Sequence, residues 1–308
     1  MNEKIIKRYV IESEKLYKTY NILCFADTQF HTNVDSRLLQ AIKDVITESE
    51  KKIDFILISG DIMSAKMYLN SKDLEEKKRI LDNLSILADA PIFLSLGNHD
   101  LSLFTDKNAE KVIKNFESLK ENTNLYPLND RVVTYDGIDI SGITLFKDNY
   151  DVKNLYGKNG RILNQKLNDF AVDPNKFNIS LIHDPLSINY SYMYNAKNIE
   201  KFNLIFSGHL HGGYLKNKDL MARTVEKLEY TEYGRNLKPY VKALLVGGEY
   251  MLGDTHLVVT EGVRKFNGYI PWFCYTTPFF SEIELKSTLD ELCNQLWLYK
   301  SMHKLSLK

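Results

Sequence analysis

The chain has 308 residues, of which 44% are hydrophobic and 26% are charged, a composition typical of a soluble globular protein with a large core. Its 40 Lys and Arg residues balance its 40 Asp and Glu residues, so it has no strongly basic field to hold a long nucleic acid. No run of about 18 apolar residues predicts a transmembrane segment, and the charged N-terminal stretch lacks the apolar core of a signal peptide.

The three cysteines lie far apart in the sequence and show no CxxC spacing: Cys24, Cys274 and Cys293. An odd number of distant cysteines is typical of reduced thiols rather than of a disulfide framework. We therefore expect a cytoplasmic protein.

The first two thirds of the chain alternate between short apolar runs and helix-length amphipathic segments. Five runs rich in Ile, Leu and Phe are typical of strands buried on both faces: 21–27, 53–61, 90–100, 177–184 and 202–213. Two amphipathic segments separate the first three runs: "DSRLLQAIKDVITESEKK", with Asp35 as the expected N-cap, and "SKDLEEKKRILDNLSILAD", with Ser71. This βαβαβ order predicts an α/β fold with a mixed or parallel sheet.

Further elements are predicted in the middle and at the end of the chain. Residues 131–146 predict a hairpin with Asp136-Gly137 in its turn. Residues 242–262 and 279–286 resemble strands, and 289–305 predict a helix. Residues 214–240 have weak periodicity and are interpreted as a small cap or a loop excursion. No long Pro/Gly/Ser linker interrupts the chain, so we expect one domain over residues 1–308.

Metal-binding residue types follow the predicted strands at their carboxyl ends. They are Asp27, Asp61, Asn98 with His99, His183, and His209 with His211. In open α/β sheets, binding groups gather at this end of the strands, so these residues are expected to converge. Each fragment alone is also compatible with a structural role such as a cap or a turn, but carboxylate, amide and imidazole together suit a divalent Mn, Fe, Zn or Ni ion.

The series Asp27-x-Gln29, Gly60-Asp61, Gly97-Asn98-His99-Asp100, His183 and Gly208-His209-x-His211 resembles the calcineurin-like metallophosphoesterases. The resemblance spans about residues 20 to 286, and the shorter members most similar to the chain are the bacterial phosphodiesterases of the YkuE type. The family implies a four-layer α/β/β/α sandwich of two mixed sheets, with two divalent metal ions at the sheet edges.

Carried over position by position, the resemblance implies a role for each matching residue. The first ion would be held by Asp27, Gln29, Asp61 and His211. The second would share Asp61 and be held also by Asn98, His183 and His209. His99 would contact the phosphate and help to protonate the leaving oxygen. Two such cations clamp the phosphoryl oxygens and activate a bridging water, which attacks as hydroxide.

Two positions depart from the family pattern. Gln29 stands where the family usually has histidine, and its amide oxygen is a weaker and harder donor, so Mn or Fe is expected over Zn or Ni. Alternatively, His31 replaces the missing imidazole. Ser64 stands where a carboxylate or amide commonly orients the histidine of the Asn-His pair, and Asp100, being adjacent to His99, is expected to point elsewhere.

These expectations add up to a dimetal phosphoesterase acting on a small phosphomonoester or phosphodiester, for example a nucleotide or a lipid-linked phosphate. A nuclease or cyclic-nucleotide phosphodiesterase is the alternative among enzymes. A catalytically weak scaffold that keeps the fold to bind a partner is the alternative of another class, and Gln29 and Ser64 motivate it.

Overall fold

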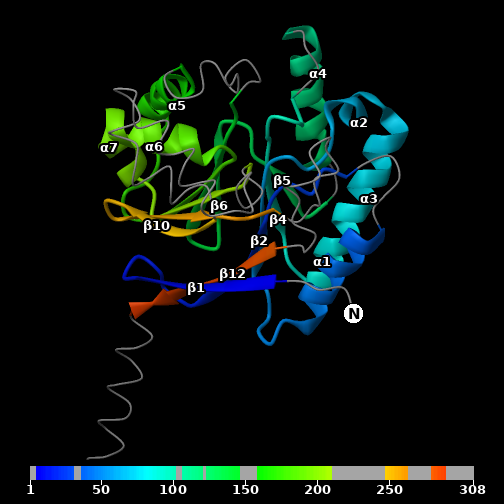
Figure 1. The fold of residues 1–308 in the computed structure, drawn as a ribbon. Helices are drawn as coiled ribbons and strands as arrows, with labels where there is room; N and C mark the ends of the chain where they lie inside the picture. Colours follow the sequence, from blue (N-terminus) through cyan, green and yellow to red (C-terminus); the bar gives the residue numbers. More distant parts are fainter. Residues whose placement is uncertain are drawn as a thin grey trace, which may run out of the picture.

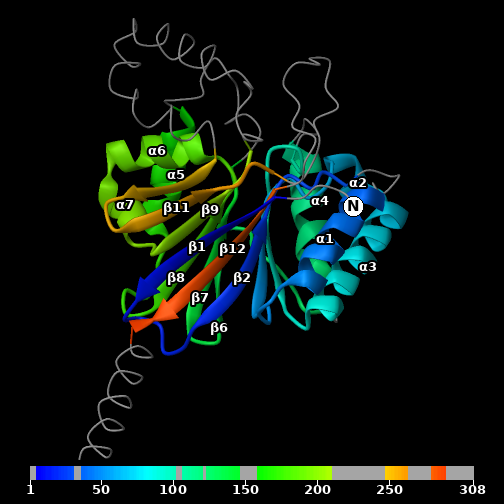
Figure 2. The same cartoon turned by 60° about the horizontal axis from the view of Figure 1, so that its bottom comes forward.

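The structure is a computed structural model that describes residues 5–30, 36–101, 106–120, 123–145, 158–209, 247–262 and 279–288. Two six-stranded mixed sheets pack face to face, and helices cover the outer face of each sheet (Figures 1 and 2). This arrangement is the predicted four-layer α/β/β/α sandwich.

The first sheet combines strands from both ends of the chain. Its order is β1 (Ile5–Ser13), β12 (Phe279–Ser287), β2 (Tyr20–Phe25), β3 (Phe55–Ser59), β4 (Ile92–Ser95) and β5 (Leu125–Pro127). Only β12 and β2 pair antiparallel in this sheet. Its helices are α1 (Ser36–Glu48), α2 (Ala65–Leu69), α3 (Ser71–Ala88) and α4 (Asp106–Glu117), followed by a 3-10 turn at Ser118–Lys120.

The second sheet is built from the second half of the chain and a central hairpin. Its order is β10 (Gly248–Leu252), β11 (Thr255–Val259), β9 (Leu204–Ser207), β8 (Phe177–Ile182), β7 (Ile138–Ile143) and β6 (Arg131–Tyr135). The pairs at its two edges are antiparallel, and the central pairs are parallel. Its outer helices are α5 (Lys158–Asp169), α6 (Pro185–Tyr194) and α7 (Ala196–Glu200).

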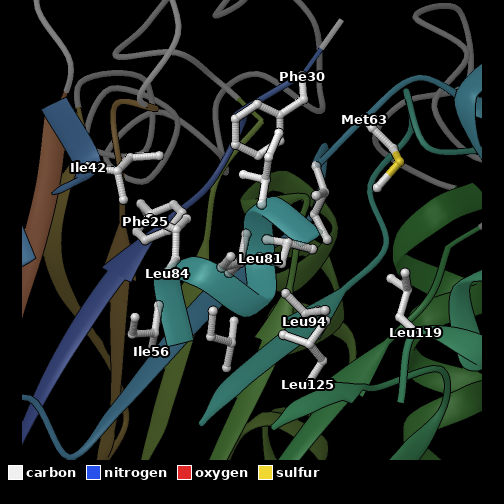
Figure 3. Close-up of a cluster of buried hydrophobic side chains, with 14 of the residues drawn as sticks. Phe25, Phe30, Ile42, Ile56, Met63, Leu81, Leu84, Leu94, Leu119 and Leu125 are labelled. Atoms are coloured by element: carbon white, nitrogen blue, oxygen red, sulfur yellow. The ribbon is translucent and has the colours of Figure 1, made fainter. Parts of the chain in front are cut away.

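Three apolar clusters hold the four layers together. One lies between the first sheet and its helices and includes Phe25, Ile56 and Leu81 (Figure 3). A second fills the space between the sheets, and a third lies under α5, α6 and α7. In β3, Ile56 belongs to the first cluster, while the adjacent Phe55 belongs to the second. A strand with core on both faces must be apolar throughout, which explains the continuous runs in the sequence.

The structure confirms the predicted hairpin and corrects one helix cap. Asp136 and Gly137 join β6 to β7 with φ angles of 48° and 81°, the left-handed conformations of a tight hairpin turn. The predicted cap Ser71 is wrong, because Asn70 caps α3 and its side chain accepts from the N–H groups of Lys72 and Asp73. Asn70 also ends α2, so one residue serves both helices.

β1 and β5 have no counterpart among the predicted strands. β1 is an edge strand with alternating exposure, and its partner β12 lies at the other end of the chain, so no local pattern marked it. Asp35 and the segments 214–240 and 289–305 lie outside the described residues. Among the helices that the structure describes, none has the length and apolar character to cross a membrane.

Candidate metal centre

The predicted site residues gather where parallel strands of the two sheets end. β2, β3 and β4 lie side by side in the first sheet, and β8 and β9 are neighbours in the second. Their carboxyl ends lie at the upper end of the sandwich in Figure 2, opposite to the arrowhead of β12. The loops that follow these strands carry Asp27, Asp61, Asn98, His183 and His209.

Asp27, Asp61 and His183 form the centre of this group. Each offers one ligand atom, and the three atoms lie within 4.8 Å of one another. The Nε2 atom of His183 is 3.4 Å from Asp61 Oδ2 and 3.7 Å from Asp27 Oδ1. All three residues are at most 1% exposed. Two carboxylates buried this closely demand a compensating positive charge.

His183 is oriented as a metal ligand. Its Nδ1–H donates to the backbone oxygen of Ser59 at 2.7 Å. Its Nε2 atom is buried and has no hydrogen-bond partner within the described part of the chain. A ligating histidine typically uses one ring nitrogen in this way to present the other to the metal.

The pKa values of His183 and Asp61 also reflect the attraction of the buried carboxylates for positive charge. Burial lowers the pKa of His183, but attraction by Asp61, followed by Asp27, outweighs burial and raises this pKa to about 10. Burial raises the pKa of Asp61, but His183, and more weakly His99 and His209, lower it below its ordinary value. Asp61 is therefore ionised in the folded chain.

Asn98 and His209 lie beside these three residues. Asn98 Oδ1 is 2.9 Å from His209 Nδ1, close enough for both residues to share one cation. The rings of His209 and His183 are 5.1 Å apart, and the backbone N–H of His209 donates to the Asp27 carboxylate at 3.1–3.2 Å. The pKa of His209 is lowered, mainly by burial, so the imidazole favours its neutral, ligating form.

The backbone of the site is strained. Four non-glycine residues here have positive φ angles: Asp27 (61°), Gln29 (39°), Asp61 (53°) and His209 (72°). Such conformations cost about 1–3 kcal/mol each and cluster at functional sites.

Two glycines allow the loops to approach this closely. A Cβ atom on Gly60 would lie 2.6 Å from His183 Nδ1, and a Cβ atom on Gly97 would lie 2.2 Å from Asp61 Oδ1. No side chain fits at either position. The glycines of the Gly-Asp and Gly-Asn-His motifs therefore serve the packing of the centre itself.

Gln29 and His99 border the centre. The amide nitrogen of Gln29 is 3.4 Å from Asp61 Oδ2, so this side chain lies beside the Asp61 carboxylate, and its predicted role as a metal ligand stays a prediction. His99 donates its backbone N–H to Asp61 Oδ1 at 2.8 Å, whereas its side chain is 48% exposed, with Nε2 3.9 Å from Asp61 Oδ2. His211 and His31 lie outside the described residues, so their roles stay predictions.

Asp100 has a function that the sequence did not indicate. Its buried carboxylate accepts from the backbone N–H groups of Gly97 (2.8 Å), Met63 (2.9 Å) and Ile62 (3.3 Å). Burial, followed by the charge of Asp61, raises its pKa to about 7. Through these bonds Asp100 ties the loop after Asp61 to the loop that carries Asn98.

Ser64, the second departure from the family pattern, directly precedes α2. The next residue, Ala65, donates its N–H to the backbone oxygen of His99 at 3.1 Å. This segment therefore makes a backbone hydrogen bond to His99, and the predicted weaker support of the imidazole by Ser64 stays a prediction.

The donor set fits a divalent cation. It combines two buried carboxylates, an unpartnered imidazole nitrogen and, beside them, an amide oxygen and a second imidazole. The chain also matches the family model of the calcineurin-like phosphoesterases over residues 20–213, which include all the motifs. The chain belongs to the calcineurin-like phosphoesterase family. It is accordingly a metal-dependent phosphoester hydrolase.

Two solved structures are similar to this calcineurin-like phosphoesterase. A dimetal phosphatase from Danio rerio is 10% identical and matches 80% of this chain and 88% of its own, with a TM-score of 0.39. GAP50, the anchor in the inner membrane complex of Plasmodium, is 14% identical and matches 87% of this chain and 82% of its own, with a TM-score of 0.43. These likenesses carry no functional argument. No match was found among curated proteins.

Proposed function

We propose that the chain hydrolyses a small phosphomonoester or phosphodiester at a centre of two divalent metal ions, with water as the nucleophile. The single observation that carries the proposal is the convergence of Asp27, Asp61 and His183, whose buried ligand atoms lie within 4.8 Å of one another. When bound, the ions neutralise the phosphoryl oxygens and lower the pKa of water from 15.7 toward about 7.

In this proposal the strand ends divide into two ligand sets that share Asp61. One set is Asp27, Gln29, Asp61 and His211. The other is Asp61, Asn98, His183 and His209. The contacts of Asp61 support its shared position, because Gln29 approaches its Oδ2 atom from one loop and His183 approaches the same atom from the other sheet.

His99 is the proposed general acid. Its exposed side chain at the rim can contact a phosphate, while its backbone is fixed by Asp61. A protonated imidazole placed within hydrogen-bond reach of the leaving oxygen can donate a proton to it.

Gln29 is proposed to set the metal preference. An amide oxygen donates more weakly than an imidazole nitrogen, so the ion at Gln29 is held less tightly, and Mn or Fe is favoured over Zn or Ni. In the alternative, His31 supplies the imidazole.

The proposed substrate is a small phosphoester rather than a long nucleic acid, because the chain has 40 basic and 40 acidic residues. A nucleotide or a lipid-linked phosphate fits this expectation. A nuclease or a cyclic-nucleotide phosphodiesterase is the second candidate, and the YkuE-type phosphodiesterases are the proposed nearest group. A cytoplasmic location belongs to the same proposal, supported by the free buried thiol of Cys24; fractionation of expressing cells tests it.

The experiment compares bis(p-nitrophenyl) phosphate with p-nitrophenyl phosphate for the metal-stripped chain with and without added Mn²⁺. We expect Mn²⁺-dependent release of p-nitrophenol from at least one substrate. Asp61→Asn is the matched control and is expected to lose at least about 100-fold in rate, because it removes the shared carboxylate. A correctly folded wild-type chain without turnover under any divalent metal would favour the scaffold.

A further inference from the structure

We propose that Ser59 is a positioning residue of the metal centre, a role that rests on the proposed function. It holds the ends of β3, β8 and β9 in one register across the gap between the two sheets. These three strand ends lead into Asp61, His183 and His209.

Ser59 makes two hydrogen bonds to the opposite sheet. Its backbone oxygen accepts from His183 Nδ1 at 2.7 Å, and its side-chain Oγ donates to the backbone oxygen of Phe206 at 2.9 Å. Ser59 belongs to the first sheet, whereas His183 follows β8 and Phe206 lies in β9 of the second sheet. Ser59 is fully buried, so water does not compete for either bond.

Both bonds are close in sequence to metal-binding positions. Ser59 is followed by Gly60 and Asp61, and Phe206 lies three residues before His209. The backbone oxygen of Gly60 also accepts the N–H of Asp27 at 3.2 Å. A shift of β3 against β9 would therefore move both carboxylates relative to the imidazoles.

The second sheet presents its two histidines as one unit. The Oγ atom of Ser207 in β9 donates to the backbone oxygen of Ile182 in β8. The N–H of Gly208 donates to the backbone oxygen of His183 at 3.1 Å. These bonds join β8 to β9 next to both histidines. The two bonds from Ser59 to Phe206 and His183 therefore position His183 and His209 together.

The chain contains a matched control for this role. Ser95 pairs directly with Ser59 in the register of β3 and β4, so the two side chains point to the same face of the sheet. Ser95 is also fully buried, but its Oγ has no hydrogen-bond partner among the described residues. Ser59→Ala and Ser95→Ala therefore remove the same atom from the same gap, and only the first removes a bond between the sheets.

The first test is a calorimetric titration of the metal-stripped chain with Mn²⁺. We expect Ser59→Ala to weaken the affinity by about 10- to 100-fold, the range found when a residue that orients a metal ligand is changed. Ser95→Ala keeps the wild-type affinity, and Ser59→Thr, which retains a hydroxyl, recovers most of it. Equal affinities for Ser59→Ala and Ser95→Ala, or a Ser59→Thr variant as weak as Ser59→Ala, would overturn the role of Ser59.

The second test needs no metal. Hydrogen exchange of the His183 Nδ1–H, followed by NMR with ¹⁵N-labelled histidine, is expected to be slow in the wild type and in Ser95→Ala and faster in Ser59→Ala. Equal exchange in the two alanine variants contradicts the inference, whatever the titration shows. A wild-type chain that binds no Mn²⁺ would reject the proposed function instead, and the exchange rates would still decide the role of Ser59.

Discussion

At the scale of single residues, the centre is defined by two buried carboxylates and the groups that face them. Asp27 and Asp61 converge on His183 Nε2, which finds no hydrogen-bond partner in the described part of the chain. A buried polar atom without a partner typically costs about 1–3 kcal/mol. Nε2 lies 3.4 Å from Asp61 Oδ2 and 3.7 Å from Asp27 Oδ1, and a site that sets this nitrogen beside two carboxylates that attract positive charge is arranged for a cation.

Gln29 gives a prediction at this scale. Gln29→His is expected to increase the zinc retained after dialysis, because imidazole is the softer donor. Gln29→Ala is expected to lose metal affinity by roughly tenfold or more, and His31→Ala to leave it unchanged. Metal content measured by mass spectrometry compares the three variants. Loss of metal in His31→Ala but not in Gln29→Ala would assign the ligand to His31, and two zinc ions firmly retained by the wild type would contradict the weak first site.

Cys24 gives a prediction for pH. Burial raises the pKa of its thiol well above the ordinary value, so the folded chain keeps this proton at a pH where the unfolded chain loses it. The free energy of unfolding therefore falls as pH rises above about 8.5, by up to about 1.4 kcal/mol per pH unit for this thiol. Cys24→Ala removes the contribution.

The test is urea unfolding of the wild type and of Cys24→Ala at about pH 9 and pH 10. All other ionisable groups are common to the two proteins, so the difference between them reports Cys24. Wild type is expected to lose more stability between the two pH values than Cys24→Ala does. Identical losses would show that Cys24 ionises equally in both states.

At the scale of elements, the strands buried on both faces were predictable, because a strand between two cores must be apolar along its length. β3, β4, β8 and β9 lie within predicted runs, β2 begins one residue before its run, and these are the strands that carry the site. β1 was not predictable, since an edge strand alternates in exposure and pairs here with the far end of the chain. β5 has only three residues, too few to form a pattern.

The caps of α3 give a prediction at this scale. Asn70→Ala removes the side chain that accepts from Lys72 and Asp73 and is expected to lower the free energy of unfolding by about 1 kcal/mol. Ser71→Ala, one residue further on, is expected to change it by less than about 0.5 kcal/mol. Urea denaturation measures both. A larger loss for Ser71→Ala would restore the cap that the sequence suggested.

The contacts between elements explain which site residues the sequence could not reveal. Asp61 and His183 each stand at the end of an apolar run that predicts a strand, so the sequence alone indicated them as candidate site residues. Ser59 acts through Phe206, which is 147 residues away, and Asp100 acts through backbone N–H groups on the loop after Asp61. A serine in a strand or an aspartate after a histidine carries no sign of such partners in a single sequence.

At the scale of the whole molecule, polar contacts join the two sheets at both ends. At the metal end, Ser59 bonds to His183 and Phe206. At the opposite end, the hydroxyl of Tyr20 donates to the backbone oxygen of Asp136 at 2.6 Å, and Lys18 pairs with the Asp136 carboxylate at 2.6 Å. The apolar cluster between the sheets fills the space between these two sets of polar contacts. The loops that carry the site therefore start from strands of two sheets that contact each other at both ends and between them.

The central claim is that these strand ends form a metal centre that hydrolyses phosphoesters. The measurement that tests it most directly is the rate of phosphoester hydrolysis as a function of the number of Mn²⁺ ions bound per chain. The substrate is bis(p-nitrophenyl) phosphate, or p-nitrophenyl phosphate if that is hydrolysed faster. The rate is expected to be zero for the stripped chain, to rise with bound metal and to reach a plateau at two ions per chain. Full hydrolysis without metal, or an unchanged curve for Asp61→Asn, would contradict the claim.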